Sequence, residues 1–139
     1  MRQMSEERLS STEELIRSSE AQPTSSVRTQ LANAMAGLKK RHYGRGPTAA
    51  KAFLEDDYAF VVLEGGLLRH EETLLELGMD DAVRSHRLKF QEAVSATACA
   101  AAEELLGRRV LAYHSQITFR PTRVFEFFVL EPASSEGSP

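Results

Sequence analysis

The hydrophobic and polar positions of the chain alternate between helical and strand-like spacing. After Ser25 and Ser26, either of which can cap a helix, apolar side chains recur every three or four residues. This pattern ends at Tyr43–Pro47, where glycines and a proline are typical of a helix end. The elements predicted after it are strands at about 50–55 and 58–64, a short helix at about 69–77, a long helix from Asp80 or Asp81 to Leu106, and strands at about 108–117 and 123–130.

In the order αββ(α)αββ, these elements predict an α+β domain with a four-stranded antiparallel sheet and helices on at least one face. The order of the strands within the sheet stays open. The last strand is apolar on both faces, with Phe125, Phe127 and Val129 on one and Val124, Phe128 and Leu130 on the other. A strand with one buried face should alternate apolar and polar residues. We therefore expect the second face to be covered by a helix, an ordered tail or another subunit.

The chain divides into three parts. Residues 1–25 are rich in Ser, Glu and Arg and predict a mobile polar arm, whereas residues 132–139 form a polar tail. Residues 26–131 are then a single domain, which accounts for most of the 139 residues.

Composition indicates the compartment. The single cysteine, Cys99, excludes an internal disulfide and suits a reducing environment, so we expect a cytoplasmic protein. Residues 1–20 lack the apolar stretch of a signal peptide. The longest strongly apolar helical stretch, 93–102, is about half the ~20 residues that a membrane span needs. We therefore expect no transmembrane segment.

Charge is strongly segregated along the chain. Residues 28–51 carry six basic residues and no acidic one, whereas residues 55–81 carry nine acidic residues and one arginine. Such segments form complementary surfaces within the fold or across a dimer, or the basic one forms a patch for phosphates or anionic lipid. A sequence pI near 5.8 argues against nucleic acid as a partner.

The loop Gly44-Arg45-Gly46-Pro47 is one candidate binding site. Glycines let backbone N–H groups converge on an anion, Arg45 can hold a phosphate, and Lys39, Lys40 and Arg41 lie in the preceding turn. The alternative is structural, because the loop follows a helix C-terminus, whose negative dipole repels anions and favours basic residues. The Gly-Lys-Ser/Thr ending of a phosphate-binding P-loop is absent.

No catalytic or metal-binding pattern emerges from the remaining reactive side chains. The histidines, at 42, 70, 86 and 114, show neither the spacing nor the neighbouring cysteines of a zinc site. Cys99 has no basic neighbour in sequence that would activate it, and no serine lies in a nucleophile-elbow motif. We expect no metal, no cofactor and no enzymatic activity, and an enzyme of unrecognised type is the least favoured alternative.

Arg87 occupies the apolar stripe of the long helix, where periodicity calls for Leu or Ile. It either extends its charged end to solvent or is buried with a carboxylate partner. Glu64 and Glu71 are the candidate partners, and we favour Glu71 because the chain turns back at Gly78 and brings the two helices together.

Self-association is a further expectation. Residues 93–102 are Ala, Val, Ser, Thr and Cys only, so this part of the helix is small and uncharged all round. Helices of this kind are usually buried or closely packed against another element. Together with the doubly apolar last strand, this indicates a symmetric homodimer.

Several segments, in order and spacing, resemble the MpsC family, which is named after the third component of a sodium-translocating, membrane-potential-generating system. They are Tyr43–Pro47, Leu63-Glu64-Gly65, Glu71 with Leu74, Val83 with Arg87, Leu106–Val110 and Glu126–Leu130. The resemblance covers residues 27–131 and implies an accessory or regulatory protein that serves membrane ion transport through a membrane-protein partner. Where the family has Thr-Pro before the short helix, this chain has Leu68-Arg69, so the start of that helix loses its hydroxyl cap.

The function predicted is therefore non-catalytic. An accessory protein of the MpsC type is the first interpretation, and a module that binds a small phosphorylated ligand through the Arg45 loop is the second.

Overall fold

The computed structural model describes residues 26–133. The arm predicted at 1–25 and most of the tail lie outside the described residues. The elements are α3 (Val27–Tyr43), β1 (Ala49–Glu55), β2 (Tyr58–Glu64), α4 (Arg69–Glu76), α5 (Asp80–Leu106), β3 (Val110–Thr118) and β4 (Arg123–Leu130). The predicted α+β class and element order are confirmed, and the predicted boundaries agree to within about two residues.

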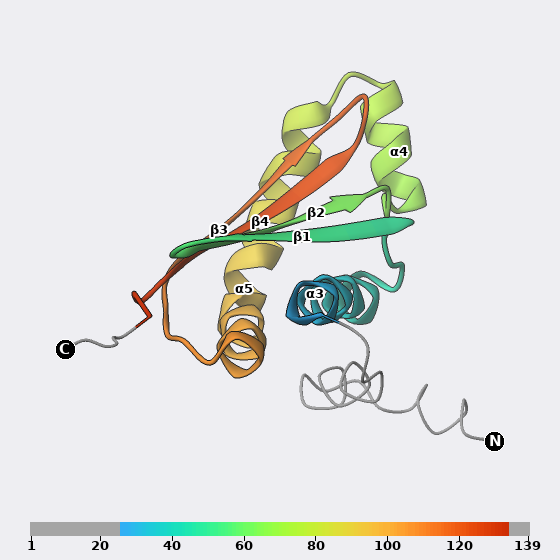
Figure 1. Cartoon of the computed structure of the whole chain (residues 1–139). Helices are drawn as coiled ribbons and strands as arrows, with labels where there is room; N and C mark the ends of the chain where they lie inside the picture. Colours follow the sequence, from blue (N-terminus) through green and yellow to red (C-terminus); the bar gives the residue numbers. More distant parts are fainter. Residues whose placement is uncertain (1–25, 134–139) are drawn as a thin grey trace.

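The four strands form one antiparallel sheet in the order β1-β2-β4-β3 (Figure 1). Both hairpins, β1–β2 and β3–β4, join neighbours in sequence, and β4 joins the two hairpins by pairing with β2. This last pairing places Glu64 opposite Arg123 and Phe60 opposite Phe127. It is also the contact that decides the strand order.

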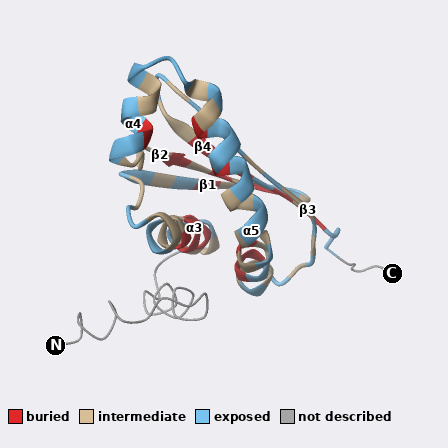
Figure 2. Cartoon of the chain, turned by 180° about the vertical axis from the view of Figure 1, so that it is seen from behind, coloured by how far each residue is buried: buried red, intermediate tan, exposed pale blue. Residues whose placement is uncertain are grey.

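Helices α3 and α5 lie side by side under one face of the sheet (Figure 1). The buried positions gather where these helices meet the strands (Figure 2). The largest fully buried apolar side chains are Phe128, Leu31, Met35, Leu63 and Leu130. The hydrophobic core therefore fills the space between this helical layer and one sheet face.

Local sequence signals explain the ends of α3. Ser26 caps its start by accepting the N–H of Thr29 at 3.2 Å. At its other end Gly44 has φ +80°, which glycine adopts without strain, and its N–H bonds to the Lys40 carbonyl at 2.9 Å. The glycine-rich loop thus terminates a helix.

Helix α4 begins at Arg69 although Leu68 offers no side-chain cap. The carboxylate of Glu71 stabilises this helix start in another way, since its Oε1 accepts the N–H of Leu68 at 2.8 Å. A glutamate at this position is the second half of a capping box. The departure from the family pattern therefore leaves the start of the helix in place.

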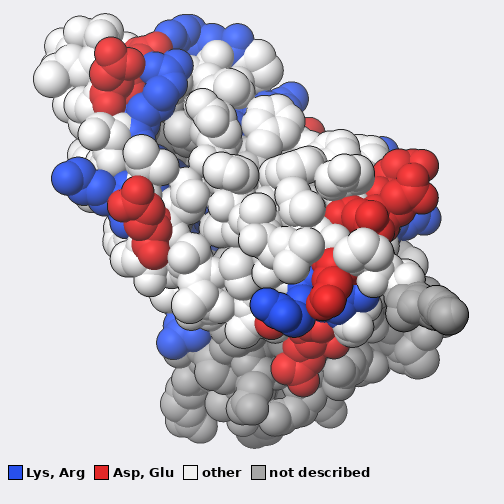
Figure 3. Space-filling model, turned by 90° about the vertical axis from the view of Figure 1, so that its left-hand side faces the viewer, with Lys and Arg blue, Asp and Glu red and all other residues white. Residues whose placement is uncertain are grey.

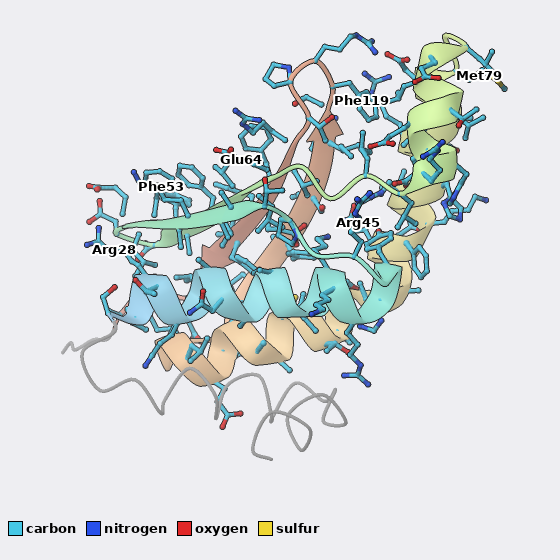
Figure 4. The ribbon with its side chains drawn as sticks, turned by 90° about the vertical axis from the view of Figure 1, so that its right-hand side faces the viewer. Arg28, Arg45, Phe53, Glu64, Met79 and Phe119 are labelled. Atoms are coloured by element: carbon cyan, nitrogen blue, oxygen red, sulfur yellow. The ribbon has the colours of Figure 1, made fainter. Side chains whose placement is uncertain are left out.

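No helix of residues 26–133 covers the other face of the sheet (Figure 1). The apolar pattern of β4 predicted that a helix, an ordered tail or another subunit covers this face. No helix of the described residues does so. Figure 4 shows Phe53 and Glu64 on this side, away from α3. Tyr58, Phe125 and Phe127 are 48%, 37% and 36% exposed there, which is high for aromatic side chains. We call this surface the open sheet face.

The small-residue part of α5 is buried on one side only. Ala98, Ala101 and Ala102 belong to the core, whereas Ala93 and Ala100 are exposed. Packing within the chain therefore explains the small residues on the buried side of this part of α5, but not those on its exposed side.

Candidate functional site

The basic residues around the Gly44–Pro47 loop point in different directions. Arg45 donates through Nη1 to the carbonyl of Leu67 at 2.6 Å, and it extends toward the loop that leads to α4 (Figure 4). Lys40 and Arg41 are exposed on α3. Lys39 turns inward, and its Nζ lies 2.9 Å from the Glu126 carboxylate. The four basic side chains proposed as one anion site are therefore divided, with Lys39 committed to the protein interior.

Arg87 lies at the junction of α3, α4 and α5. Its Nε and Nη2 donate to the two carboxylate oxygens of Glu71 at 2.7 and 2.6 Å, and Nη2 also reaches the Gly66 carbonyl at 3.3 Å. Its guanidinium carbon lies 4.1 Å from the centre of the Tyr43 ring. Arg87 is 8% exposed and Glu71 1%. Of the two candidate partners, the structure places Glu71 on Arg87, and the pair is bidentate and buried.

Glu64, the other candidate partner, lies elsewhere. Its carboxylate is 3.9 Å from Nε of Arg123, the residue opposite it on β4. Both side chains are partly exposed at the end of the open sheet face.

The Arg87–Glu71 contact stabilises the charged form of each group. Burial alone would raise the pKa of Glu71, but the hydrogen bonds from Arg87 and Leu68, together with the charge of Arg87, lower it below its ordinary value of 4.5. Burial would likewise lower the pKa of Arg87, yet Glu71 raises it. Both groups are therefore held as ions at neutral pH, which favours a structural ion pair over proton transfer.

A second buried polar cluster is built around Glu126 of β4, which is 1% exposed. Its carboxylate accepts hydrogen bonds from Tyr113 and from Ser115, the latter at 2.7 Å, and pairs with Lys39. Burial, reinforced by the Glu126 charge, raises the pKa of Tyr113 far above its ordinary value of 10.0. Tyr113 is therefore a hydrogen-bond donor here and stays protonated at neutral pH.

Sequence reasoning missed this cluster, although a signal was present. Glu126 is two residues from both Val124 and Phe128 in β4, and side chains two residues apart in a strand point to the same face. The Glu126 side chain therefore points into the core with theirs. A charged residue at such a position requires partners. The alternation of the two strand faces predicts its burial. Its partners come from α3 and β3, so they could be identified only from the tertiary structure.

The two clusters border an open cavity of about 150 Å³ between α3, α5 and the β3–β4 pair. Its basic and aromatic lining comes from Lys39, Tyr43, Arg84 and Arg87. Gln91, Ser115 and Gln116 add amide and hydroxyl groups. The Glu71 and Glu126 carboxylates neutralise Arg87 and Lys39, and Arg84 pairs with the exposed Asp81 at 2.9 Å. Hydrogen-bond donors therefore surround a small solvent-accessible space.

The segregated charges do not pair with each other in the described part of the chain. Among the ion pairs of residues 26–133, five of the nine acids of 55–81 are held by arginines that follow them in sequence, at positions 84, 87, 108, 120 and 123. Lys39, from the basic segment, pairs with Glu126. No ion pair of the described residues therefore joins the basic segment to the acidic one.

Groups that could perform chemistry are few in the described residues. Burial, then the charges of Glu103 and Glu126, raise the pKa of Cys99, which disfavours its nucleophilic thiolate. Within residues 26–133, no three His, Cys, Asp or Glu side chains are grouped to hold a metal ion. No helix in this range is long and apolar enough to cross a membrane.

Fold and site together define an α+β domain in which buried ion pairs join α5 to α4 and α3 to the sheet. Residues 24–132 match the profile of the MpsC family, described as the Na+-translocating membrane potential-generating system, so the chain belongs to that family. No curated protein matched the chain, and no solved structure did.

Proposed function

We propose that this chain is a non-catalytic accessory or regulatory component that serves a sodium-translocating, membrane-potential-generating system by contact with a membrane-protein partner. The family match carries this proposal, because residues 24–132 include every described helix and strand. A shared family over this domain supports a shared system, since every helix and strand of residues 26–133 lies within the match.

The state of four groups, Glu71, Glu126, Tyr113 and Cys99, supports binding over catalysis. Glu71 and Glu126 are each saturated by two or three donors, and the pKa shifts of Tyr113 and Cys99 keep both groups protonated. A general base or nucleophile needs a free or activated group instead.

Crosslinking in cells, followed by purification of the tagged chain from solubilised membranes, tests the partner. We expect a membrane protein of the sodium-translocating system to be enriched over a tag-only control. The non-catalytic role is tested separately, because Cys99→Ala and His86→Ala chains should restore sodium-dependent membrane potential as well as the wild type in cells lacking the protein. Absence of any enriched membrane protein contradicts the first part, and loss of function in either variant contradicts the second.

A small anionic ligand is a second candidate, and one observation favours it. The cavity between α3 and α5 has a volume close to the 150 Å³ of an engineered cavity that binds benzene, and hydrogen-bond donors line it. A group of phosphate or small carboxylate size suits this space. This location differs from the Arg45 loop, whose arginine already donates to Leu67.

Thermal unfolding with inorganic phosphate, small carboxylates and phosphorylated metabolites tests this candidate, because a ligand of the folded state raises the melting temperature. Arg84→Gln at the cavity and Arg45→Gln at the loop form a matched pair of variants. Loss of the shift in Arg84→Gln alone assigns the ligand to the cavity, whereas loss in Arg45→Gln alone assigns it to the loop. No shift with any compound contradicts both.

A further inference from the structure

The open sheet face has an ordered chemical pattern across all four strands. In the register of the sheet, one row of outward positions is Phe53, Phe60, Phe127 and His114, one ring from each strand. The rings of Phe53 and Phe60 stack with centroids 4.8 Å apart. The neighbouring row on one side has Val62 and Phe125 on the two central strands, β2 and β4. The neighbouring row on the other side has Tyr58 and Val129 on the same two strands. The middle of the face is therefore apolar and aromatic.

Charges lie mainly at the margins of this face. Figure 3 shows a broad stretch of uncharged side chains on one side of the molecule, with acidic and basic residues around it. At one end of the two central strands, Glu64 lies opposite Arg123. A contiguous apolar area with a charged rim is typical of a protein–protein interface. Single-stranded nucleic acid also stacks on aromatic side chains, but it requires a positively charged groove.

We propose that the open sheet face binds the same face of a second copy and forms a two-fold symmetric dimer. The axis runs parallel to the strands, between β2 and β4. Such an axis exchanges the positions of β2 and β4, so Phe60 of one copy faces Phe127 of the other. Val62 in the same way faces Phe125. Apolar side chains thus meet apolar side chains across the centre of the interface.

The same axis provides charge complementarity. Glu64 of each copy comes next to Arg123 of the other, because these residues occupy equivalent places on the two exchanged strands. The weak pair within one chain, at 3.9 Å, becomes an alternating cluster of four charges. Burial of this end by a second copy strengthens the attraction, since the effective dielectric constant falls. A partner of one charge sign would leave either Glu64 or Arg123 opposed by a like charge.

The size of the face also suits a second copy. With strand spacing of about 4.8 Å and a rise of about 3.3 Å per residue, four strands of seven to nine residues give a face roughly 20 Å across the strands and roughly 25 Å along them. Two such faces in contact bury on the order of 1,000 Å², the lower bound for a specific interface. Sheets that pack face to face at about −30° form the core of β-sandwiches in this way.

Mixing of two charge variants tests the geometry. Glu64→Arg gives a chain with two arginines at this end of the face, and Arg123→Glu gives a chain with two glutamates. Each variant alone opposes like charges in its own dimer, whereas the mixture opposes Arg to Glu at both places. Sedimentation velocity from about 1 to 100 µM should therefore show a wild-type dimer, at least tenfold weaker dimers for each variant alone, and recovery in the equimolar mixture.

Three further variants identify the surface. Phe127→Asp should give a monomer with an unchanged circular dichroism spectrum. Leu77→Asp, at an apolar residue that is 68% exposed at the C-terminal end of α4 and outside the sheet, should remain dimeric. Ala96→Asp on the exposed side of α5 should also remain dimeric, which separates the open sheet face from the small-residue stripe.

Two results would overturn this dimer. If the wild-type chain is monomeric over the whole concentration range, the proposed dimer is wrong, and residues outside 26–133 or another protein cover this face. A dimer that is lost in Ala96→Asp, or that shows no recovery in the mixture of charge variants, would place the interface elsewhere.

Discussion

Arg87 of α5 holds Glu71 of α4 through two hydrogen bonds of 2.7 and 2.6 Å, and both side chains are buried. The same glutamate caps α4 by accepting the Leu68 N–H, while the guanidinium lies over Tyr43 of α3. One ion pair therefore positions three helices and one wall of the cavity. Its removal should affect both stability and the shape of the candidate site.

Arg87→Lys should destabilise the protein although it retains the charge, because an ammonium group cannot form the two parallel hydrogen bonds. Arg87→Ala or Glu71→Ala should cost about 3–5 kcal/mol, since each leaves the other charge buried without a partner. Chemical denaturation of both single variants and the double variant measures the coupling energy, which we expect above about 1 kcal/mol. Arg84→Lys, at an exposed position of the same helix, is the control. Zero coupling would mean that Arg87 acts only through its packing.

The lowered pKa of Glu71 predicts a pH dependence of stability. Below its ordinary pKa of 4.5, the unfolded chain takes up a proton at this residue before the folded chain does. Its contribution is therefore complete above about pH 5.5 and declines as pH falls through 4.5 toward the lower pKa of the folded state. Denaturation of wild type and Glu71→Gln at successive pH values should show a shallower acid decline in the variant. Parallel curves would contradict the assignment of this decline to Glu71.

Lys39 and Lys40 are adjacent but have different environments. Lys39 pairs with buried Glu126, whereas Lys40 is exposed. Lys39→Met should cost about 2–4 kcal/mol, because the carboxylate then keeps only the hydroxyl donors of Tyr113 and Ser115. Lys40→Met should change the free energy of unfolding by less than about 0.5 kcal/mol. Urea denaturation of the two variants compares them directly, and equal effects would contradict the inward role of Lys39.

Arg108 and Arg109 form a second adjacent pair with different contacts. Arg108 joins the β1–β2 turn to the chain after β4, because it donates to the carbonyls of Glu131 and Asp56 at 2.9 Å and to the carboxylate of Asp57 at 2.6 Å. Arg108→Ala should cost about 1–3 kcal/mol and speed hydrogen exchange in that turn. Arg109→Ala, at an exposed position, should do neither. An unchanged exchange rate in Arg108→Ala would mean that the turn holds its conformation alone.

Much of the fold could be predicted because its signals are local. Helical spacing, the cap at Ser26 and the glycine at 44 depend on residues within a few positions of each other, so the element order and approximate boundaries follow from them. Arg87 was recognisable as a candidate buried charge because it interrupts an apolar stripe. Its partner was predictable because only the short turn at Gly78 separates α4 from α5.

Other features depend on contacts between distant segments, which no local pattern encodes. The pairing of β2 with β4 decides the strand order, and it joins residues about sixty to seventy positions apart. The direction of Lys39 depends on Glu126 of β4, so its charge alone suggested a surface site. The apolar pattern of β4 predicted that both of its faces are buried. Only the tertiary structure placed α3 and α5 on the same side of the sheet and left an aromatic face open, because helix packing and strand pairing together decide which face each helix covers.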